Sequence, residues 1–309
     1  MKKDKLSRRE FVMKTGTALT GAAVGSLLIP NLAQAAFANT NLPIINKGKI
    51  KWCMYTYTIF GGTMPINEVD IVDMCLKTKA MGIDAMDIIG AGYNKSWKEI
   101  RKITDDHGID VVCYTKGVKG LESTDEAIIK KSIDDFKKNI EIAHILGSKR
   151  MMMNMGGTTP DRHENRKNLI TSLKKVVPIA TSEGIEVTIE HHNNPKAPFR
   201  ISSDFDEAIA VLPDFRVTYD SGNIHIAGQD SVEGYKKNQD KITHVHFKDL
   251  SPKGGVCVPG EGIIDFPNII KAMKAANYNG YVNIEVPSKK LDGYESYKKA
   301  MDILNPLIA

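Results

Sequence analysis

The chain has 309 residues, of which 42% are hydrophobic and 26% charged, and this balance excludes an intrinsically disordered or membrane-spanning protein. The formal net charge of +5 is concentrated in residues 1–35, where six basic and two acidic residues give +4 and leave +1 for the rest. Nucleic acid is therefore excluded as the expected partner, because binding to phosphates needs clustered Lys and Arg.

Residues 1–35 resemble a twin-arginine signal peptide. Residues 7–14 read SRREFVMK, with the pair Arg8 and Arg9, and a mildly apolar run over 15–30 follows. This run is too short and too weakly apolar to span a membrane. The small-x-small pattern at 33–35, Ala33-Gln34-Ala35, predicts cleavage by signal peptidase after Ala35, with cleavage after Ala38 as the alternative. We therefore expect the twin-arginine export machinery as a partner, and a mature protein in the periplasm or another extracytoplasmic compartment.

Residues 41–309 alternate between short β-branched or apolar runs and longer stretches of helical period. The predicted strands are 52–58, 85–89, 111–115, 150–154, 186–190, 216–220, 244–248 and 281–286. Between them we predict helices such as 68–81, 124–146, 166–183 and 266–276, several of which end at a glycine (Gly82, Gly108, Gly147 and Gly184) suited to a left-handed C-cap. Strands joined through helices are parallel, and eight of them predict an α/β fold with a single (β/α)8 TIM barrel as one domain.

Polar residues stand at or near the ends of the last four predicted strands: Glu190, Asp220, His246 and Glu285. The carboxyl ends of barrel strands meet at one mouth, and buried carboxylates are rare unless they are paired or bind a metal. Three carboxylates and one imidazole form an oxygen-rich site, which favours Mn²⁺, Mg²⁺ or Co²⁺ and suits Zn²⁺ less well. The alternative is a set of rim carboxylates paired with Lys or Arg.

Five segments carry a resemblance to a known family: TIE at 188–190, YDSGN at 219–223, HVHFKD at 244–249, PGEG at 259–262, and YNGY at 278–281. In this order they resemble the sugar phosphate isomerase/epimerase family of xylose isomerase-like TIM barrels. Residues 41–184 agree with the family only in the rhythm of strands and helices. The resemblance implies one divalent metal ion, preferably Mn²⁺, held by Glu190, Asp220, His246 and Glu285. It also makes Glu190 and Glu285 the acid/base pair on opposite sides of the substrate.

The implied activity is that of a metal-dependent isomerase or epimerase, which removes a proton next to a carbonyl of a free sugar or sugar derivative. The residue types suit this reaction, because a cation stabilises the resulting enediolate while a carboxylate takes the proton. His192 resembles a substrate-binding histidine of the family, with a neutral loop histidine as the alternative. Lys248 is expected to bind a substrate oxygen or to pair with Asp249 at the rim.

Asn223 is a further expected substrate-binding residue, and it departs from the family pattern. Ketose 3-epimerases carry a histidine three residues after the metal-binding aspartate and an arginine six residues after the metal-binding histidine, where this chain has Asn223 and Pro252. This difference argues against a ketohexose as the substrate. His244 is expected to be a hydrogen-bonded core residue. Weaker candidates, expected to line or pack around the site, are Tyr55, Tyr57, Asp87 and His225.

Three other functions are compared with the same sequence features. Loss of a β-substituent after the same proton abstraction would make the protein a 3-keto-glycoside lyase. A sugar-binding protein without catalytic activity would need neither a metal nor paired carboxylates. A DNA-repair endonuclease of the same barrel type is disfavoured by the near-neutral charge. Self-association into a homo-oligomer is left open, and the four cysteines, without Cys-x-x-Cys spacing, are expected to be packed thiols.

Overall fold

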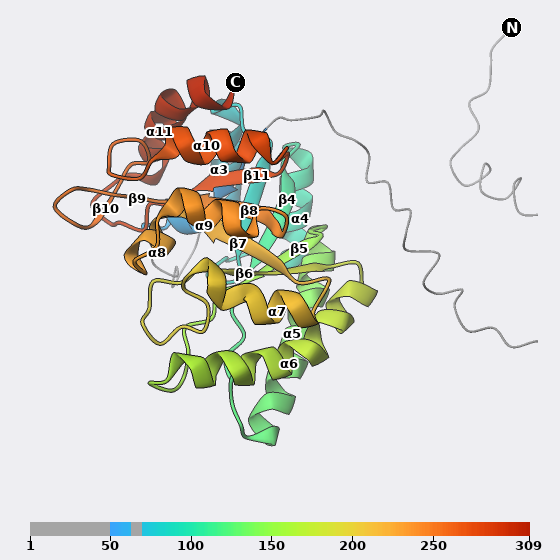
Figure 1. Cartoon of the computed structure of the whole chain (residues 1–309). Helices are drawn as coiled ribbons and strands as arrows, with labels where there is room; N and C mark the ends of the chain where they lie inside the picture. Colours follow the sequence, from blue (N-terminus) through green and yellow to red (C-terminus); the bar gives the residue numbers. More distant parts are fainter. Residues whose placement is uncertain (1–49, 63–69) are drawn as a thin grey trace, which may run out of the picture. The chain divides into compact units, whose positions relative to one another are not determined.

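A ring of parallel strands organises residues 50–62 and 70–309, the part of the chain that the computed structural model describes (Figure 1). The strands of this ring are β1 (Lys51–Trp52), β2 (Met54–Tyr55), β3 (Ala85–Ile89), β4 (Asp110–Thr115), β5 (Arg150–Met153), β6 (Glu186–Glu190), β7 (Arg216–Asp220), β8 (Ile242–Phe247) and β11 (Tyr281–Ile284). Their order is β1-β11-β8-β7-β6-β5-β4-β3-β2. Only Cys53 separates β1 from β2, so the two share one strand position and close the ring at eight positions. The predicted (β/α)8 barrel is confirmed.

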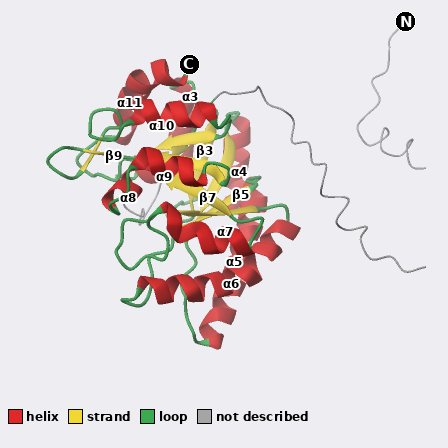
Figure 2. Cartoon of the chain, in the orientation of Figure 1, coloured by secondary structure: helices red, strands yellow, loops and turns green. Residues whose placement is uncertain are grey.

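Helices surround the strands, as Figure 2 shows. They are α2 (Thr56–Ile59), α3 (Ile71–Ala80), α4 (Trp97–Asp106), α5 (Glu126–Leu146), α6 (Arg162–Ser182), η1 (Ser202–Phe205), α7 (Asp206–Val211), α8 (Ser221–Ile226), α9 (Ser231–Asn238), α10 (Phe266–Ala275) and α11 (Gly293–Ile308). A small antiparallel hairpin of β9 (Asp249–Leu250) and β10 (Val256–Cys257) follows β8. Among the described residues, no helix combines the length and apolar character needed to cross a bilayer.

Side-chain caps and glycines define most helix ends. Aspartates cap α3, α5, α6, α8, α9, α10 and α11 by accepting backbone N–H groups of the first turn. The four predicted C-terminal glycines have φ values between 63° and 73°, the left-handed region that a residue without a Cβ adopts most easily. Each strand therefore starts shortly after the preceding helix ends.

The barrel interior is polar near the carboxyl ends of the strands. On β6, Thr188 and Glu190 alternate with the apolar residues Val187 and Ile189, so one kind of side chain faces inward and the other faces the helices. The contact between His244 of β8 and Asp87 of β3 joins strands that are not neighbours, which places both side chains inside the ring. A middle layer contains Asp87, Thr188, Thr218, His244 and Asn283, all fully buried. An interior this polar differs from the branched apolar filling typical of such barrels and indicates a functional interior.

Two further predictions have clear outcomes. The predicted strand 52–58 is wrong beyond Tyr55, because Thr56 begins α2. There the Thr58 hydroxyl donates to the Ile284 carbonyl at 2.7 Å and turns the chain across the end of β11.

The cysteines are free thiols; three are buried and Cys257 is partly buried. The predicted signal peptide, residues 1–35, lies outside the described residues.

Candidate functional site

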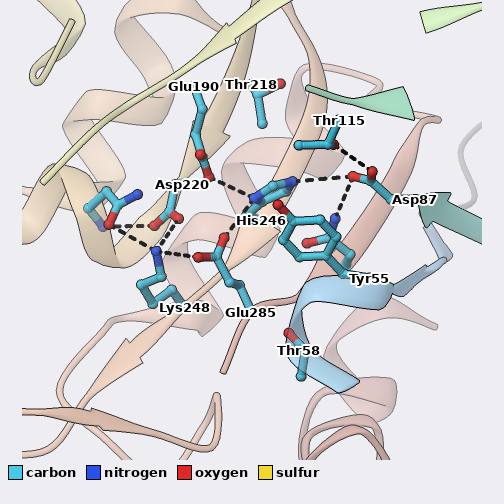
Figure 3. A network of polar contacts seen from close by, with 12 residues as sticks. Tyr55, Thr58, Asp87, Thr115, Glu190, Thr218, Asp220, His246, Lys248 and Glu285 are labelled. Atoms are coloured by element: carbon cyan, nitrogen blue, oxygen red, sulfur yellow. Dashed lines mark hydrogen bonds and ion pairs between the residues drawn. The ribbon is translucent and has the colours of Figure 1, made fainter. Parts of the chain in front are cut away.

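The four residues predicted as metal ligands lie together at the carboxyl-terminal mouth of the barrel. Glu190 and Asp220 end β6 and β7, His246 is the penultimate residue of β8, and Glu285 directly follows β11. Each offers a ligand atom; these atoms lie within 4.8 Å of one another, and all four residues are buried. We call them the four-residue cluster (Figure 3).

His246 lies between the two glutamates. Its Nδ1 is 2.7 Å from Glu190 Oε1 and 2.8 Å from Glu285 Oε2. Only the contact to Glu285 has hydrogen-bond geometry, and Glu190 Oε1 is buried without a hydrogen-bond donor among the described residues. The ring of Tyr55 packs on the imidazole with 4.8 Å between the ring centroids. The Nδ1 edge of His246 therefore faces two carboxylates, while Tyr55 restricts the tilt of the ring.

Asp220 is both a member of the cluster and the N-cap of α8. Its Oδ1 accepts the backbone N–H groups of Gly222 at 2.9 Å and Asn223 at 2.7 Å. These two bonds fix the carboxylate plane and leave Oδ2 to face the site. The order of the chain, an aspartate at the end of a strand followed at once by a helix, thus orients one ligand oxygen.

Lys248 occupies the centre of the acidic residues. Its Nζ lies 2.8 Å from Asp220 Oδ2 and 2.7 Å from Glu285 Oε1 (Figure 3). It also donates to Asn223 Oδ1 at 2.9 Å. An ammonium group has three hydrogens, so each has an acceptor here. Asn223 also donates through Nδ2 to the His191 carbonyl at 2.9 Å. The two predicted substrate-binding residues Lys248 and Asn223 are therefore both held by protein groups.

Asp249, the alternative partner of Lys248, has a different role. Its carboxylate accepts the backbone N–H groups of Gly260 at 2.9 Å, Gly262 at 2.8 Å and Ile264 at 3.1 Å. The residue is fully buried and shapes the glycine-containing loop after β10. The interpretation of Lys248 and Asp249 as a pair at the rim is wrong.

Burial disfavours the charged form of every group in the cluster, and the neighbouring charges set the direction in which each pKa shifts. Burial alone would raise the pKa of Glu285, but the charge of Lys248 and the hydrogen bond from His246 hold it well below its usual value. Burial would lower the pKa of His246, but Glu190, Asp87 and Glu285 together raise it well above its usual value. For Asp220, burial and the charges of Glu285 and Glu190 outweigh Lys248, so the pKa is raised. The raised pKa of Asp220 reflects the repulsion among the three carboxylates, which Lys248 and His246 only partly offset.

These features fit a divalent cation. The donor set of three carboxylates and one imidazole is oxygen-rich, the type that suits Mn²⁺, Mg²⁺ and Co²⁺. Glu190 Oε1 is a buried carboxylate oxygen without a hydrogen-bond donor among the described residues, so it has room for a ligand bond. The repulsion among the three carboxylates, which raises the pKa of Asp220, also favours a cation. Glu190, Asp220, His246 and Glu285 are therefore the residues that could hold the metal.

Two residues flank Glu190. Asn154, directly after β5, donates through Nδ2 to Glu190 Oε2 at 3.0 Å, a role that the sequence reasoning missed. The available signal was an amide at the carboxyl end of the predicted strand 150–154. His192 Nδ1 accepts the backbone N–H of Asn194 at 2.9 Å, and burial lowers its pKa, so its free nitrogen Nε2 carries a hydrogen.

The weaker candidates divide into two groups. Tyr55 and Asp87 both contact His246, with Asp87 Oδ2 lying 3.6 Å from Nε2. Tyr57 is half-buried beside Tyr55, at 5.7 Å between ring centroids, whereas His225 is exposed on α8. His244 is buried and bonds Asp87, as expected of a core histidine.

Comparisons with known proteins agree with this architecture. Residues 75–307 match the family described as xylose isomerase-like TIM barrel. The inosose dehydratase of Clostridium perfringens is 28% identical over 142 residues, covering 40% of this chain and 47% of that protein. The chain thus spans about half the length of the curated relatives it matches.

Two solved structures share the fold. The IOLI protein with a bound zinc atom has a TM-score of 0.71 at 18% identity, covering 84% of this chain and 98% of that one. The 3-keto-D-glucoside 4-epimerase YcjR from E. coli has a TM-score of 0.68 at 20% identity, covering 84% of this chain and 100% of that one. Because the family match at 75–307 contains the whole four-residue cluster and spans most of the barrel, the chain belongs to the family of xylose isomerase-like TIM barrels.

Proposed function

We propose that this chain is a metal-dependent isomerase or epimerase that removes a proton next to a carbonyl of a free sugar or sugar derivative. The observation that carries the proposal is the placement of two buried glutamates on one imidazole nitrogen, 2.7 Å and 2.8 Å from His246 Nδ1. The names of the similar proteins, inosose dehydratase and 3-keto-D-glucoside 4-epimerase, support a sugar-type substrate.

A divalent ion in the four-residue cluster, for which we propose Mn²⁺, would supply the positive charge that stabilises an enediolate. The protein groups move the protons. Glu190 is the first base in this proposal: Oε1, which has no donor among the described residues, would bind the metal, and Oε2 accepts one bond, from Asn154, and keeps a lone pair for the proton. On the other side of the substrate the proton is returned through Glu285, which is ionised at rest and receives that proton from the Lys248 ammonium 2.7 Å from its Oε1.

Substrate oxygens would meet one hydrogen-bond donor and one positive charge. His192 offers Nε2–H, because its Nδ1 is already an acceptor. Lys248 brings a positive charge against Glu285, and Asn223 holds that charge in place at 2.9 Å. We propose that His192 binds the substrate directly, and that Asn223 acts on it through Lys248.

The proposal is tested by metal-dependent exchange of a carbon-bound proton. The mature protein, without the predicted signal peptide, is treated with chelator and reloaded with Mn²⁺, Mg²⁺, Co²⁺ or Zn²⁺. It is then incubated in D₂O with free sugars and 3-keto-glycosides. NMR should show deuterium at the carbon next to the carbonyl only in the reloaded samples. Binding of sugars without exchange at any metal concentration would favour a sugar-binding protein.

A 3-keto-glycoside lyase is the second candidate. Asn223 stands where ketose 3-epimerases carry a substrate-gripping histidine, and both ends of its amide are bonded within the protein, to Lys248 and the His191 carbonyl. A similar solved structure is also described as acting on a 3-keto-glucoside. Loss of the β-substituent in the same D₂O experiment would identify the lyase.

We also propose that Arg8 and Arg9 direct export through the twin-arginine machinery to the periplasm or another extracytoplasmic compartment. The support is the motif at residues 7–14 and the apolar run after it. Replacing both arginines by lysine should leave folded precursor in the cytoplasm. Undiminished export of that double variant would refute the assignment.

A further inference from the structure

Asp87 is a fully buried carboxylate in the middle of β3. Thr115 donates to its Oδ1 at 2.6 Å, while His244 Nε2 lies 2.9 Å and Asn283 Nδ2 3.2 Å from its Oδ2. A buried carboxylate is costly unless such partners compensate it. These partners come from β4, β8 and β11, so three strands fix both oxygens of Asp87.

The same carboxylate faces the metal-binding candidate His246. The two ring nitrogens of His246 point in opposite directions: Nδ1 faces Glu190 and Glu285, and Nε2 lies 3.6 Å from Asp87 Oδ2 (Figure 3). Nε2 is buried and has no hydrogen-bond partner among the described residues. Because an N–H···O bond spans up to about 3.2 Å, a shift of about 0.4 Å would close this contact.

A histidine that binds a metal through one nitrogen almost always donates its other N–H to an acceptor. Here the acceptor nearest to Nε2 is a carboxylate that three other side chains already hold. Tyr55 packs on the face of the same imidazole at 4.8 Å between ring centroids. Tyr55 thus limits the tilt of the ring, and Asp87 is the acceptor that its Nε2 edge faces.

We propose that Asp87 is a positioning residue, which holds the Nε2–H edge of His246 and thereby keeps the Nδ1 lone pair aimed at the metal. This inference rests on the proposed metal site. His244 and Asn283 would act one step further back, by fixing Asp87 Oδ2 at the distance that reaches His246. The network extends the site from the mouth of the barrel into its middle layer.

A second cation between Asp87, His244 and His246 is the competing interpretation, because their ligand atoms lie within 4.8 Å of one another. The 2.9 Å separation between His244 and Asp87 is that of a hydrogen bond, which needs no ion. The number of ions bound separates the two interpretations.

The test measures Mn²⁺ binding to the full-length mature protein by titration calorimetry, for the wild type, Asp87→Asn and Thr188→Val. Thr188 is the matched control, since it is a buried polar residue of the same layer whose hydroxyl pairs with Thr218. We expect one ion per chain throughout, affinity 10–100-fold weaker in Asp87→Asn, and a loss of affinity below that range in Thr188→Val.

A measurement on the wild type keeps the proposal testable if Asp87→Asn does not fold. In Zn²⁺-loaded protein with ¹⁵N-labelled histidine, His246 should show a slowly exchanging proton on Nε2, assigned by its loss in His246→Gln. A proton on Nδ1, or unchanged affinity in a folded Asp87→Asn, would overturn the role of Asp87 alone. Two ions in the wild type and one in Asp87→Asn would replace it with a second metal site. A wild type that binds no divalent ion would contradict both the metal site and this role.

Discussion

Lys248 and Asp220 form a buried ion pair, with Nζ 2.8 Å from Oδ2. Because the other oxygen of Asp220 caps α8, the oxygen that meets Lys248 is also the one that would bind a metal. Glu285 shares the same ammonium at 2.7 Å. The lysine therefore stabilises the ligand carboxylates in the metal-free protein, and a bound ion would take over part of that role.

Replacing Lys248 tests whether the lysine and a bound metal ion stabilise the same carboxylates. Lys248→Met leaves two buried carboxylates without their cation, so the metal-free protein should lose on the order of 3–5 kcal/mol of unfolding free energy. Mn²⁺ should restore part of it, and the rise in melting temperature on adding Mn²⁺ should exceed that of the wild type. Lys236→Met, which removes a lysine that is 51% exposed, is the control. Equal Mn²⁺-induced shifts in Lys248→Met and the wild type would contradict this account.

Gly222 makes room for the same lysine. A Cβ at this position would lie 2.7 Å from Lys248 Cγ, so Gly222→Ala should displace the lysine and cost about 1–3 kcal/mol of stability. Its Mn²⁺ affinity should also change. Gly184→Ala is the matched control: φ is +71°, but a Cβ there meets no atom within 4 Å, so it should cost about 1 kcal/mol and leave Mn²⁺ binding unchanged. Urea unfolding with chelator and calorimetric titration of Mn²⁺ give the two quantities, and identical Mn²⁺ affinities in both variants would argue against this packing role.

His191 should make stability depend on pH. Burial lowers its pKa to about 4, outweighing the hydrogen bond with the Thr218 carbonyl. The histidine is therefore neutral when folded, and protons bind the unfolded chain first. Neutral His191 contributes at most about 3 kcal/mol to the free energy of unfolding. This contribution is complete above about pH 6.5 and is lost as the pH falls towards 4.

His191→Phe is the variant that isolates this titration, because it keeps the ring packing on Phe205 at 4.8 Å between centroids. Between pH 6.5 and 4 its unfolding free energy should fall less steeply than that of the wild type, by up to the slope of one proton. Urea unfolding in chelator measures both slopes. Parallel curves would mean that His191 does not titrate on unfolding.

The strands and the four-residue cluster were predictable because both depend on local pattern. Strands β3, β6 and β7 have the predicted bounds, since each combines apolar residues facing the helices with a sharp glycine or loop boundary. Glu190, Asp220, His246 and Glu285 come together because the ends of parallel barrel strands meet at one mouth.

Contacts across the barrel were not predictable in the same way. Asp87 and His246 are 159 positions apart and lie on strands that are not neighbours, so no spacing in the sequence relates them. The inward direction of Lys248 depends on the close approach of Gly222, a packing detail without a sequence signature. The helix that begins at Thr56, where a strand was predicted, is a similar case. The Thr56 hydroxyl donates to the Asp87 carbonyl at 3.2 Å, and this bond forms only in the closed barrel.

The central claim is that Glu190 and Glu285 move the protons, and the most direct measurement is deuterium exchange by Glu190→Gln and Glu285→Gln at saturating Mn²⁺. Each substitution keeps the side-chain volume and removes a basic carboxylate, so turnover should fall by about 10²–10⁴-fold. Glu190→Gln should lose exchange at the carbon next to the carbonyl. Glu285→Gln should retain exchange from one face if the enzyme is an epimerase, or fail later in turnover if it is a lyase. Wild-type exchange and product formation in both variants would contradict the account and turn attention to His192 as the base.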